Sequence, residues 1–362
     1  MSEPRIVELL RDIKPRRIVI IKPSALGDVV QTLPLLPVLK RKYPEAHIDW
    51  VIRSELADLL ENHPDLERLL IYHRKGNLSS ATQLLRALWN GRYDLALDLQ
   101  GLLRTGVMTA ATRATLRVGM ETSREYAHLA CHGLLPGTSK QVPAHARYWQ
   151  IARLLGEESE PQPVQLGVGE QDRKRVDEIL AEIPGPFLAI HPGAMWVTKR
   201  WPISSFAEVG KRACQQYGLH LVVVGTQGEK GAAEQLCQQV RQACPERIVR
   251  NLAGETSLKQ LAVVLDRARI VLSNDSGPMH MAAMMGTPVV GIFTCTSAQR
   301  SGPGGKQHQL VQAKVPCAAS YRKQCPFSGS GHMQCLSAVS VFQVWSAFQR
   351  AIEASDKREQ VA

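Results

Sequence analysis

The sequence predicts an α/β protein with two doubly wound parallel-sheet domains, and three observations carry this prediction. A chain of 362 residues exceeds the length of one ordinary domain, about 150 residues. Short apolar, β-branched runs alternate with helical patterns, which favours parallel sheets covered by helices on both faces. The alternation stops at a polar, proline-bearing stretch, residues 157–163, and then starts again. That interruption indicates a linker between two domains.

The first half of the chain contains four predicted strands and two predicted helices. Residues 17–22 form a short apolar run that is typical of a buried strand. A turn leads from it into a predicted helix over residues 29–43. The next strands are predicted at 47–52, 69–72 and 94–99, with a helix at 78–89.

The second half repeats the alternation. Strands are predicted at 187–190, 219–225, 248–252, 270–273 and 288–293, with helices from about residue 229 and over 277–285. A last helix, residues 338–354, has an apolar face made of Val341, Val344, Trp345, Phe348 and Ala351. We therefore expect domains at 1–165 and 166–337, followed by a helical segment at 338–362.

The composition limits which kinds of partner the protein can bind and indicates in which cellular compartment it is found. The net charge of +11 favours an anionic partner, which could be a nucleic acid, a membrane surface or a phosphorylated substrate. Aromatic residues make up only 5%, which counts against base stacking. The sequence has no run of 18 apolar residues and no apolar region near Met1, so we expect a cytoplasmic protein. Its eight cysteines are then expected as free thiols or metal ligands.

Ligands of parallel α/β sheets bind at the carboxyl ends of the strands, so the turns after the strands are the candidate sites. The first is Lys22-Pro-Ser-Ala-Leu-Gly-Asp28. Gly27 permits a tight turn, and Asp28 falls at the start of a helix, where it is either a cap or a general base. The turn lacks the G-x-G-x-x-G fingerprint, which counts against a nicotinamide oxidoreductase.

The second turn follows the strand at 187–190 and runs from His191 to Pro202. Its loop carries Thr198, Lys199 and Arg200. Two adjacent cations at the end of a strand suit a diphosphate. The alternative is a solvated loop with ordinary surface charges.

The third turn is Ser273-Asn-Asp-Ser-Gly-Pro-Met-His280. Backbone N–H groups at the start of the following helix form an anion site, and Asp275 could hold a ribose or sugar hydroxyl. The alternative is a capping turn with Asp275 or Ser276 as the cap and His280 in the core. Residues 276–352 contain six Lys and Arg but no Asp or Glu, so a positive field is expected beside this turn.

Together these turns resemble glycosyltransferase family 9, the ADP-heptose:lipopolysaccharide heptosyltransferases. The resemblance rests on Lys22 to Pro34, Leu97-Asp-Leu-Gln-Gly-Leu-Leu-Arg104, His191-Pro-Gly193 with Lys199-Arg-Trp-Pro202, and Ser273 to His280. It covers about residues 17–345 in the family's order. It implies a GT-B fold with an acceptor-binding domain at 1–165, a nucleotide-sugar-binding domain at 166–337, and a last segment, 338–362, that crosses back to the first domain.

The resemblance also implies an inverting transfer of heptose from ADP-heptose to a hydroxyl of the anionic lipopolysaccharide core, at the inner membrane surface. Asp28 would be the base, and Lys199 would hold the diphosphate. The residues implied for the donor are Thr198, Lys199, Glu229, Thr256, Asp275, Ser276, Gly277 and His280, and those implied for the acceptor are Arg104, Arg117 and Arg124. Because Lys199 and a helix N-terminus can stabilise the leaving diphosphate, no cofactor and no divalent metal at the donor are expected.

One departure from the family's pattern concerns cysteines. Many members carry a C-x2-C-x4-C cluster before the final helix, but here Ser320 stands where the second cysteine would be. The remaining candidate metal ligands are Cys317, Cys325, His332 and Cys335. The spacing fits no common structural zinc pattern, and buried free thiols are the alternative.

Two other functions remain open from the sequence. A glycosyltransferase of the same fold could use another nucleotide-sugar or a protein acceptor. A basic nucleic-acid-binding protein would suit the pI near 9.4. The sequence contains no recognisable nucleic-acid-binding module, so nucleic acid is not an expected partner.

Overall fold

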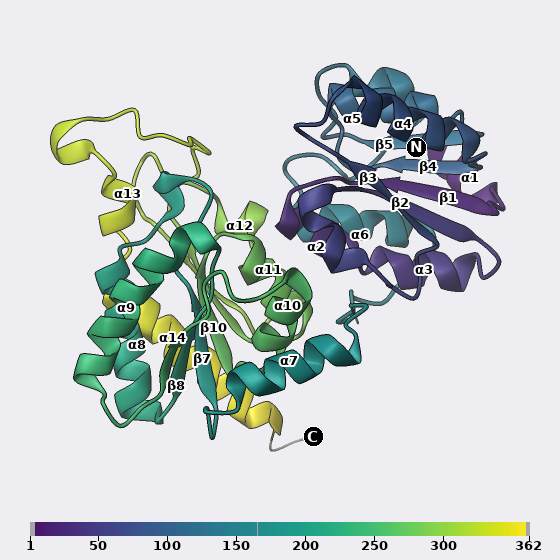
Figure 1. Cartoon of the computed structure of the whole chain (residues 1–362). Coiled ribbons are helices and arrows are strands. Elements are labelled where there is room, and N and C mark those ends of the chain that lie inside the picture. The colour runs from purple at the N-terminus through teal and green to yellow at the C-terminus, as the bar shows by residue number, and fades with distance from the viewer. Residues whose placement is uncertain (1–3, 165, 360–362) are drawn as a thin grey trace. The chain divides into compact units, whose positions relative to one another are not determined.

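The computed structural model describes residues 4–164 and 166–359, with the side chains of the last helix described as far as Ser355. The chain divides into two compact units, Met1–Gly167 and Val168–Ala362. Each unit is an α/β domain with its own parallel sheet (Figure 1). No helix in the described ranges is both long enough and apolar enough to span a bilayer.

The sheet of the first unit has six strands, all parallel, in the order β3-β2-β1-β4-β5-β6. The central strands β1 and β4 are mostly apolar and, apart from Arg17, buried, because helices cover both faces, as expected of a parallel sheet. The strands are β1 (Arg17–Ile21), β2 (His47–Arg53), β3 (Arg68–Tyr72), β4 (Leu95–Asp98), β5 (Leu116–Met120) and β6 (Gly133–Leu135).

Six helices accompany this sheet. One face is covered by α4 and α5, and the other by α2, α3 and α6, which contact one another (Figure 1). Beneath α4 and α5, a core cluster includes Leu84, Leu88 and Met108. The helices are α1 (Arg5–Asp12), α2 (Leu26–Thr32), α3 (Leu35–Lys42), α4 (Leu78–Asn90), α5 (Leu103–Ala111) and α6 (Ala144–Leu154).

The sheet of the second unit also has six parallel strands, in the order β12-β11-β10-β7-β8-β9. Its central strands are likewise fully buried. The strands are β7 (Phe187–His191), β8 (His220–Val223), β9 (Val249–Asn251), β10 (Ile270–Asn274), β11 (Val289–Phe293) and β12 (Gln309–Gln312).

One face of the second sheet packs against α8, α9 and α14 around a large apolar core, and α7, α10 and α11 lie on the other (Figure 1). The apolar face of α14 that the sequence predicts packs in this core through Val344, Trp345 and Phe348. The helices are α7 (Glu170–Leu180), α8 (Ile203–Tyr217), α9 (Lys230–Ala243), α10 (Leu258–Arg267), α11 (Gly277–Met284), α12 (Ala298–Ser301), α13 (Gln334–Ser337) and α14 (Val341–Glu359). The return of the last segment to the first domain stays a prediction.

Both sheets have the same topology when each is counted from its own first strand, namely 3-2-1-4-5-6. This is the doubly wound order in which the chain reverses direction across the sheet between the first and fourth strands. The fold class predicted from the sequence is confirmed. Ligands of such sheets bind at that reversal, beyond the carboxyl ends of the strands. The reversal lies between β1 and β4 in the first unit and between β7 and β10 in the second.

One predicted helix is wrong in its extent. The region 29–43 forms two helices, α2 and α3, which are separated at Leu33 and Pro34. Proline lacks the N–H that a continuous helix would need at this point, and its ring crowds the carbonyl of the preceding turn, so the helix is interrupted although Leu33 keeps helical backbone angles. The break ends α2 one turn after Asp28.

Candidate active site

The first candidate site lies at the reversal point of the first sheet, where Lys22 follows β1 and Asp28 lies in the first turn of α2. The Lys22 side chain is 3% exposed and that of Asp28 is 38% exposed. Lys22 Nζ lies 3.6 Å from Asp28 Oδ2. The turn therefore buries the cation and presents the carboxylate to solvent.

Tyr148 of α6 is a partner that the sequence analysis missed. Its hydroxyl donates a hydrogen bond to Asp28 Oδ1 at 3.1 Å, and Lys22 Nζ lies 5.1 Å from the centre of its ring. Burial, together with the nearby Asp28 carboxylate, raises the pKa of Tyr148 well above 10. The phenol therefore stays protonated and remains a donor to Asp28 throughout the neutral range.

The capping interpretation of Asp28 holds in part. The N–H of Ala25 donates to Asp28 Oδ2 at 3.3 Å, so this carboxylate satisfies a backbone group at the helix start. Its other oxygen faces the Tyr148 hydroxyl. The cap and the hydroxyl together fix the orientation of the carboxylate while it remains accessible, so a capping role and a role as base are compatible.

A second carboxylate, Asp98, lies at the end of β4, the neighbouring strand at the reversal point. It is fully buried, and it accepts hydrogen bonds from the N–H of Gln100 at 3.0 Å, the N–H of Gly101 at 2.9 Å and the hydroxyl of Thr105 at 3.1 Å. Burial raises the pKa of Asp98, although these bonds oppose the change. Burial also lowers the pKa of Lys22, and Asp28 and Asp98 oppose that shift.

Two of the three arginines predicted for the acceptor lie at this edge of the sheet. Arg104 is in the first turn of α5, directly after β4, and Arg124 is in the loop after β5. The loops are joined because the N–H of Arg124 donates to Gly101 O at 2.9 Å. Both side chains are exposed and available to an anionic ligand.

Arg117, the third predicted arginine, is not at this edge. It lies near the amino end of β5, and its guanidinium donates to Ala130 O at 2.8 Å and Ala114 O at 3.0 Å. These bonds hold the strand to the segments on either side of it. The structure therefore does not bring Arg117 together with Asp28.

The second candidate site lies at the reversal point of the second sheet. Lys199 ends a 3-10 turn after β7, and Asp275 follows β10. Lys199 Nζ lies 2.8 Å from Asp275 Oδ2 and 3.3 Å from Asp275 O. The Lys199 side chain is 17% exposed and that of Asp275 is 6% exposed. In this pair the carboxylate is the more deeply buried partner.

His280 of α11 is the other partner of Asp275, with Nε2 3.8 Å from Oδ1. Burial alone would raise the pKa of Asp275, but His280 and Lys199 outweigh burial and lower the pKa to about 2. Asp275 is therefore ionised at neutral pH and holds the Lys199 ammonium. His280 is buried, and its Nδ1 has no hydrogen-bond partner among the described residues, so it could accept or donate one bond to a ligand.

Asn274 fixes the loop that carries Lys199, a role that the sequence analysis did not assign. Its Nδ2 donates to Pro192 O at 2.7 Å, and its Oδ1 accepts from the N–H of Trp201 at 3.1 Å. The Trp201 ring is buried, and its Nε1 donates to Val339 O at 2.8 Å. Both ends of the loop are therefore tied to the core, and Lys199 is presented from a fixed segment.

His191, at the end of β7, links two of the predicted donor residues. Its Nδ1 lies 3.0 Å from Ser276 Oγ, and its Nε2 lies 3.8 Å from Glu229 Oε2. The nearby His191 ring, aided by a hydrogen bond from the N–H of Thr226, lowers the pKa of Glu229 to about 2. Gly193 lies so close to Glu229 that a side chain at this position would collide with the carboxylate. The sequence analysis placed His191 and Gly193 in the second candidate turn but assigned no function to either residue.

The start of α11 matches the third predicted turn. Ser276 is the N-cap residue, yet its hydroxyl bonds with His191 and makes no capping bond within the described helix. Gly277 and Pro278 follow as its first residues. The helix therefore begins without a side-chain cap and keeps its N-terminal dipole available for an anion.

The other predicted donor residues differ in accessibility. Thr198 is buried, and its hydroxyl donates to Arg322 O at 2.7 Å, so it ties the loop down. Arg200 is exposed, and its Nε donates to Ala194 O at 2.8 Å. Thr256 is half-buried in the turn between β9 and α10, at the same edge of the sheet.

The candidate metal ligands do not form a metal site. In the described ranges, no three His, Cys, Asp or Glu side chains are grouped so that they could hold a metal ion. All eight cysteines are free thiols. Burial raises the pKa of Cys335 to about 11, with smaller contributions from Cys317, Cys295 and Cys325. His332 Nδ1 lies 2.9 Å from Phe327 O.

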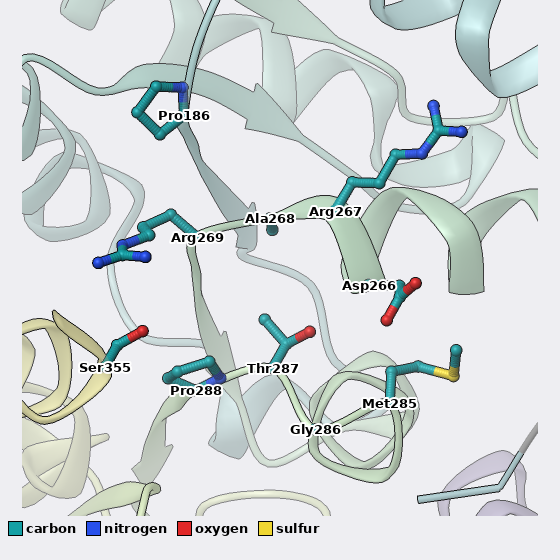
Figure 2. A pocket seen from close by; sticks show the side chains of 10 residues that line it. All are labelled: Pro186, Asp266, Arg267, Ala268, Arg269, Met285, Gly286, Thr287, Pro288 and Ser355. Carbon is teal, nitrogen blue, oxygen red and sulfur yellow. The ribbon is translucent and has the colours of Figure 1, made fainter. Parts of the chain in front are cut away.

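A hollow of about 500 Å³ lies at the opposite edge of the second sheet (Figure 2). It is lined by residues that precede β7, β10 and β11, among them Pro186, Arg269 and Pro288. Figure 2 shows Arg267 and Arg269 pointing away from each other. This hollow is therefore at the amino ends of the strands and is separate from the Lys199 site.

A family model and curated relatives place the chain in one family. The model of glycosyltransferase family 9 (heptosyltransferase) matches residues 81–330. Lipopolysaccharide heptosyltransferase 1 of Pseudomonas aeruginosa is 27% identical over 323 residues, covering 86% of this chain and 88% of the relative.

Solved structures match over nearly the whole chain. A family 9 glycosyl transferase of Veillonella parvula gives a TM-score of 0.77 at 24% identity, covering 94% of this chain and 97% of the other. Escherichia coli ADP-heptose lps heptosyltransferase II gives 0.73 at 21% identity, covering 94% and 99%. These matches confirm the predicted GT-B fold class.

Proposed function

The chain belongs to glycosyltransferase family 9, the heptosyltransferases, and from this premise we propose that it transfers heptose from ADP-heptose to a hydroxyl of the lipopolysaccharide inner core, with inversion. Relatives that are named as lipopolysaccharide and ADP-heptose heptosyltransferases support this choice of substrates. The observation that carries the proposal is a lysine–carboxylate pair at the reversal point of each sheet, with opposite burial in the two units.

On the acceptor side, the proposed base is Asp28. In the transfer, the acceptor oxygen bonds to the anomeric carbon, its proton passes to Asp28, and the bond from that carbon to the diphosphate breaks as ADP leaves with the electron pair. A base must be exposed to its substrate and held in one orientation. The accessible Asp28 carboxylate, the Tyr148 hydroxyl at 3.1 Å and the buried Lys22 support this role.

On the donor side, Lys199 is proposed to bind the diphosphate. An ammonium group has three N–H donors, and Asp275 engages two of them through Oδ2 and its backbone oxygen. Lys199 Nζ also lies 4.7 Å from the centre of the Trp196 ring, and we propose that its third N–H turns to a phosphate oxygen when the donor binds. We propose that the start of α11, at Ser276 and Gly277, faces the same diphosphate, and that His280, Glu229 and Thr256 contact the rest of the donor.

We also propose that transfer needs no divalent metal at the donor. Charge that develops on the leaving ADP must be stabilised by groups already in place, and Lys199 and the α11 dipole meet that need. Asp275, a carboxylate of this site, already pairs with Lys199 at 2.8 Å and lies 3.8 Å from His280. Single-turnover transfer to a small soluble acceptor should therefore survive exhaustive EDTA treatment. Complete loss that magnesium restores would refute this part of the proposal.

The acceptor proposal rests on Arg104 and Arg124, which are exposed at the same sheet edge as Asp28. An acceptor rich in phosphate and carboxylate suits arginine, whose planar fork binds such groups in a bidentate manner. Because Arg117 is engaged with backbone oxygens at the other end of β5, we leave it out of this set.

The experiment that tests the function is a transfer assay with the purified chain. ADP-heptose and a delipidated core acceptor should give a product heavier by one heptose in mass spectra, while UDP-sugars should give none. Comparing the lipopolysaccharide core of cells with and without the protein would identify the acceptor position. Transfer from a UDP-sugar, or to protein but not to the core, would contradict the proposal.

A further inference from the structure

The loop that joins β12 to α13 brings two cations to the carboxyl edge of the second sheet. In this loop, the N–H of Tyr321 donates to Cys295 O at 2.8 Å, and Cys295 follows the carboxyl end of β11. Arg322 O accepts the hydroxyl of Thr198 at 2.7 Å. Residues 321–323, which we call the basic segment, are therefore docked against the turn after β7.

The contacts of Tyr321 fix the conformation of the basic segment. The φ angle of this residue is 56°, which is unusual for a bulky side chain. Its hydroxyl accepts the N–H of Ser297 at 3.3 Å and lies 2.8 Å from Ser301 Oγ. The Arg300 guanidinium lies 4.9 Å from the centre of its ring. The two cations that follow Tyr321 therefore extend from a backbone that the fold holds in one place.

Trp196 connects the basic segment to the proposed diphosphate site. The centre of its ring lies 4.7 Å from Lys199 Nζ and 5.9 Å from Lys323 Nζ. The two ammonium groups therefore cannot lie farther apart than the sum of these distances. Because the face of an aromatic ring attracts cations, Trp196 holds both ammonium groups in the same part of the sheet edge.

The charges of the two lysines are balanced differently. Lys199 pairs with Asp275, whereas Lys323 is exposed and has the Trp196 ring but no carboxylate as a partner among the described residues. Two like charges beside one ring repel each other. An anion with several negative charges relieves that repulsion, and a diphosphate offers one phosphate to each ammonium group.

We propose that Lys323 is a second ammonium group of the donor site and binds the diphosphate of the nucleotide-sugar together with Lys199. The inference rests on the proposed function. Trp196 is a positioning residue that keeps both side chains near the diphosphate. The second ammonium group also stabilises the charge that develops on the diphosphate as it leaves. The alternative is a solvated lysine that rests on a tryptophan and makes no contact with the nucleotide.

Calorimetry of the full chain with ADP tests the role of Lys323. Lys323→Gln should bind ADP about three- to tenfold more weakly than the parent, because one charged contact with the diphosphate is lost. Adenosine has no phosphate, so its affinity should be the same for both proteins. The matched control, Lys306→Gln, removes an exposed lysine shortly before β12, at the opposite edge of the sheet. It should bind ADP within about twofold of the parent.

The contribution of the ring is measured in variants of Trp196. In the Trp196→Leu background, Lys323→Gln should weaken ADP binding less than it does in the parent, because the leucine no longer holds Lys323 beside Lys199. Trp196→Phe keeps an aromatic face and should preserve the full effect of Lys323→Gln. An undiminished effect in the leucine background would contradict the role given to the ring.

The outcomes separate this inference from the proposed function. If the parent does not bind ADP, the proposed function is wrong. If the parent binds ADP and Lys323→Gln binds it equally well, the inference is overturned and Lys323 is a solvated surface lysine. Equal weakening by Lys323→Gln and Lys306→Gln also overturns it, because ADP would then respond only to the overall charge of the unit.

Discussion

The reversal points of the two sheets contain the same pair of residue types with opposite burial. In the first unit Lys22 is 3% exposed and Asp28 is 38% exposed. In the second unit Lys199 is 17% exposed and Asp275 is 6% exposed. Strand order is the same in both units. Lys22 and Asp28 share the turn after β1, whereas Lys199 follows β7 and Asp275 follows β10. The difference in burial therefore accompanies a difference in which strand supplies the carboxylate.

The comparison shows how one scaffold can support two kinds of chemistry. A buried lysine and a tyrosine hydroxyl beside an accessible carboxylate hold that carboxylate in one orientation, which suits proton abstraction. A buried carboxylate beside an accessible lysine holds the ammonium in place, which suits the binding of a phosphate. Mutations at the two pairs should therefore separate turnover from nucleotide binding.

The largest expected effect is on turnover in Asp28→Asn. The amide cannot accept the acceptor proton, so the single-turnover rate should fall by roughly 10²- to 10⁴-fold. The α2 helix should persist, because the amide oxygen can still accept the N–H of Ala25, which circular dichroism can check. A variant that keeps more than half of the parental rate would leave Asp28 as a helix cap only.

Lys199→Ala should have the next largest effect, on the donor. Loss of a charge-assisted hydrogen bond costs about 1.5–3 kcal/mol, which raises KM for ADP-heptose by roughly ten- to a hundredfold. Lys199→Arg is the matched control, since it keeps the charge but places a wider planar group beside Asp275. An unchanged KM in the alanine variant would remove Lys199 from the donor site.

Asp275→Asn should change the response of stability to acid. The pKa of Asp275 is about 2 in the folded chain, against an ordinary 3.8. A depressed carboxyl pKa stabilises the fold above about pH 4, and this stabilisation is lost as pH falls towards 2. The free energy of unfolding of the parent should thus exceed that of the variant by about 2 kcal/mol at pH 7 and approach it near pH 2.

Denaturant titrations of both proteins at several pH values measure this difference. Glu178→Gln, which removes an exposed ion pair with Arg175, is the control, and because exposed ion pairs contribute little its free energy of unfolding at pH 7 should stay close to that of the parent. Parallel curves for the parent and Asp275→Asn would show that Asp275 is not held ionised by Lys199 and His280.

The smallest effect is expected from Tyr148→Phe. The phenol donates to Asp28 and thereby favours its ionised form. Without this donor, the acid limb of the profile of log kcat against pH should move to higher pH by up to about one unit. Near pH 8, where the base is fully ionised, the rate should stay within a few-fold of the parent. An unmoved limb would mean that Tyr148 supports packing alone.

Much of the fold followed from local sequence. Apolar runs such as Arg17–Ile21 and Ile270–Asn274 are buried on both faces, so their pattern is unambiguous. The split of α2 from α3 was missed because an apolar pattern continues across Pro34. The strands β5, β6 and β12 were not assigned, nor were several helices, among them α5, α6 and α8.

Only those site residues that directly follow a predicted strand could be predicted from the sequence. Asp28 and Asp275 occupy turns at the carboxyl ends of parallel strands, where ligands of such sheets bind. Tyr148 is 120 residues from Asp28 along the chain, and it meets Asp28 only through the packing of α6 against α2, which no local pattern encodes. The family resemblance grouped Arg117 with Arg104, but its position near the start of β5 places it at the other end of that strand.

The most direct test of the division between the two pairs is calorimetry of ADP binding to the parent, Asp28→Asn and Lys199→Ala in one buffer. We predict that Asp28→Asn binds ADP within about twofold of the parent, and that Lys199→Ala binds at least about tenfold more weakly. Equal weakening by the two substitutions, or none by Lys199→Ala, would contradict the assignment of one pair to the acceptor proton and the other to the diphosphate.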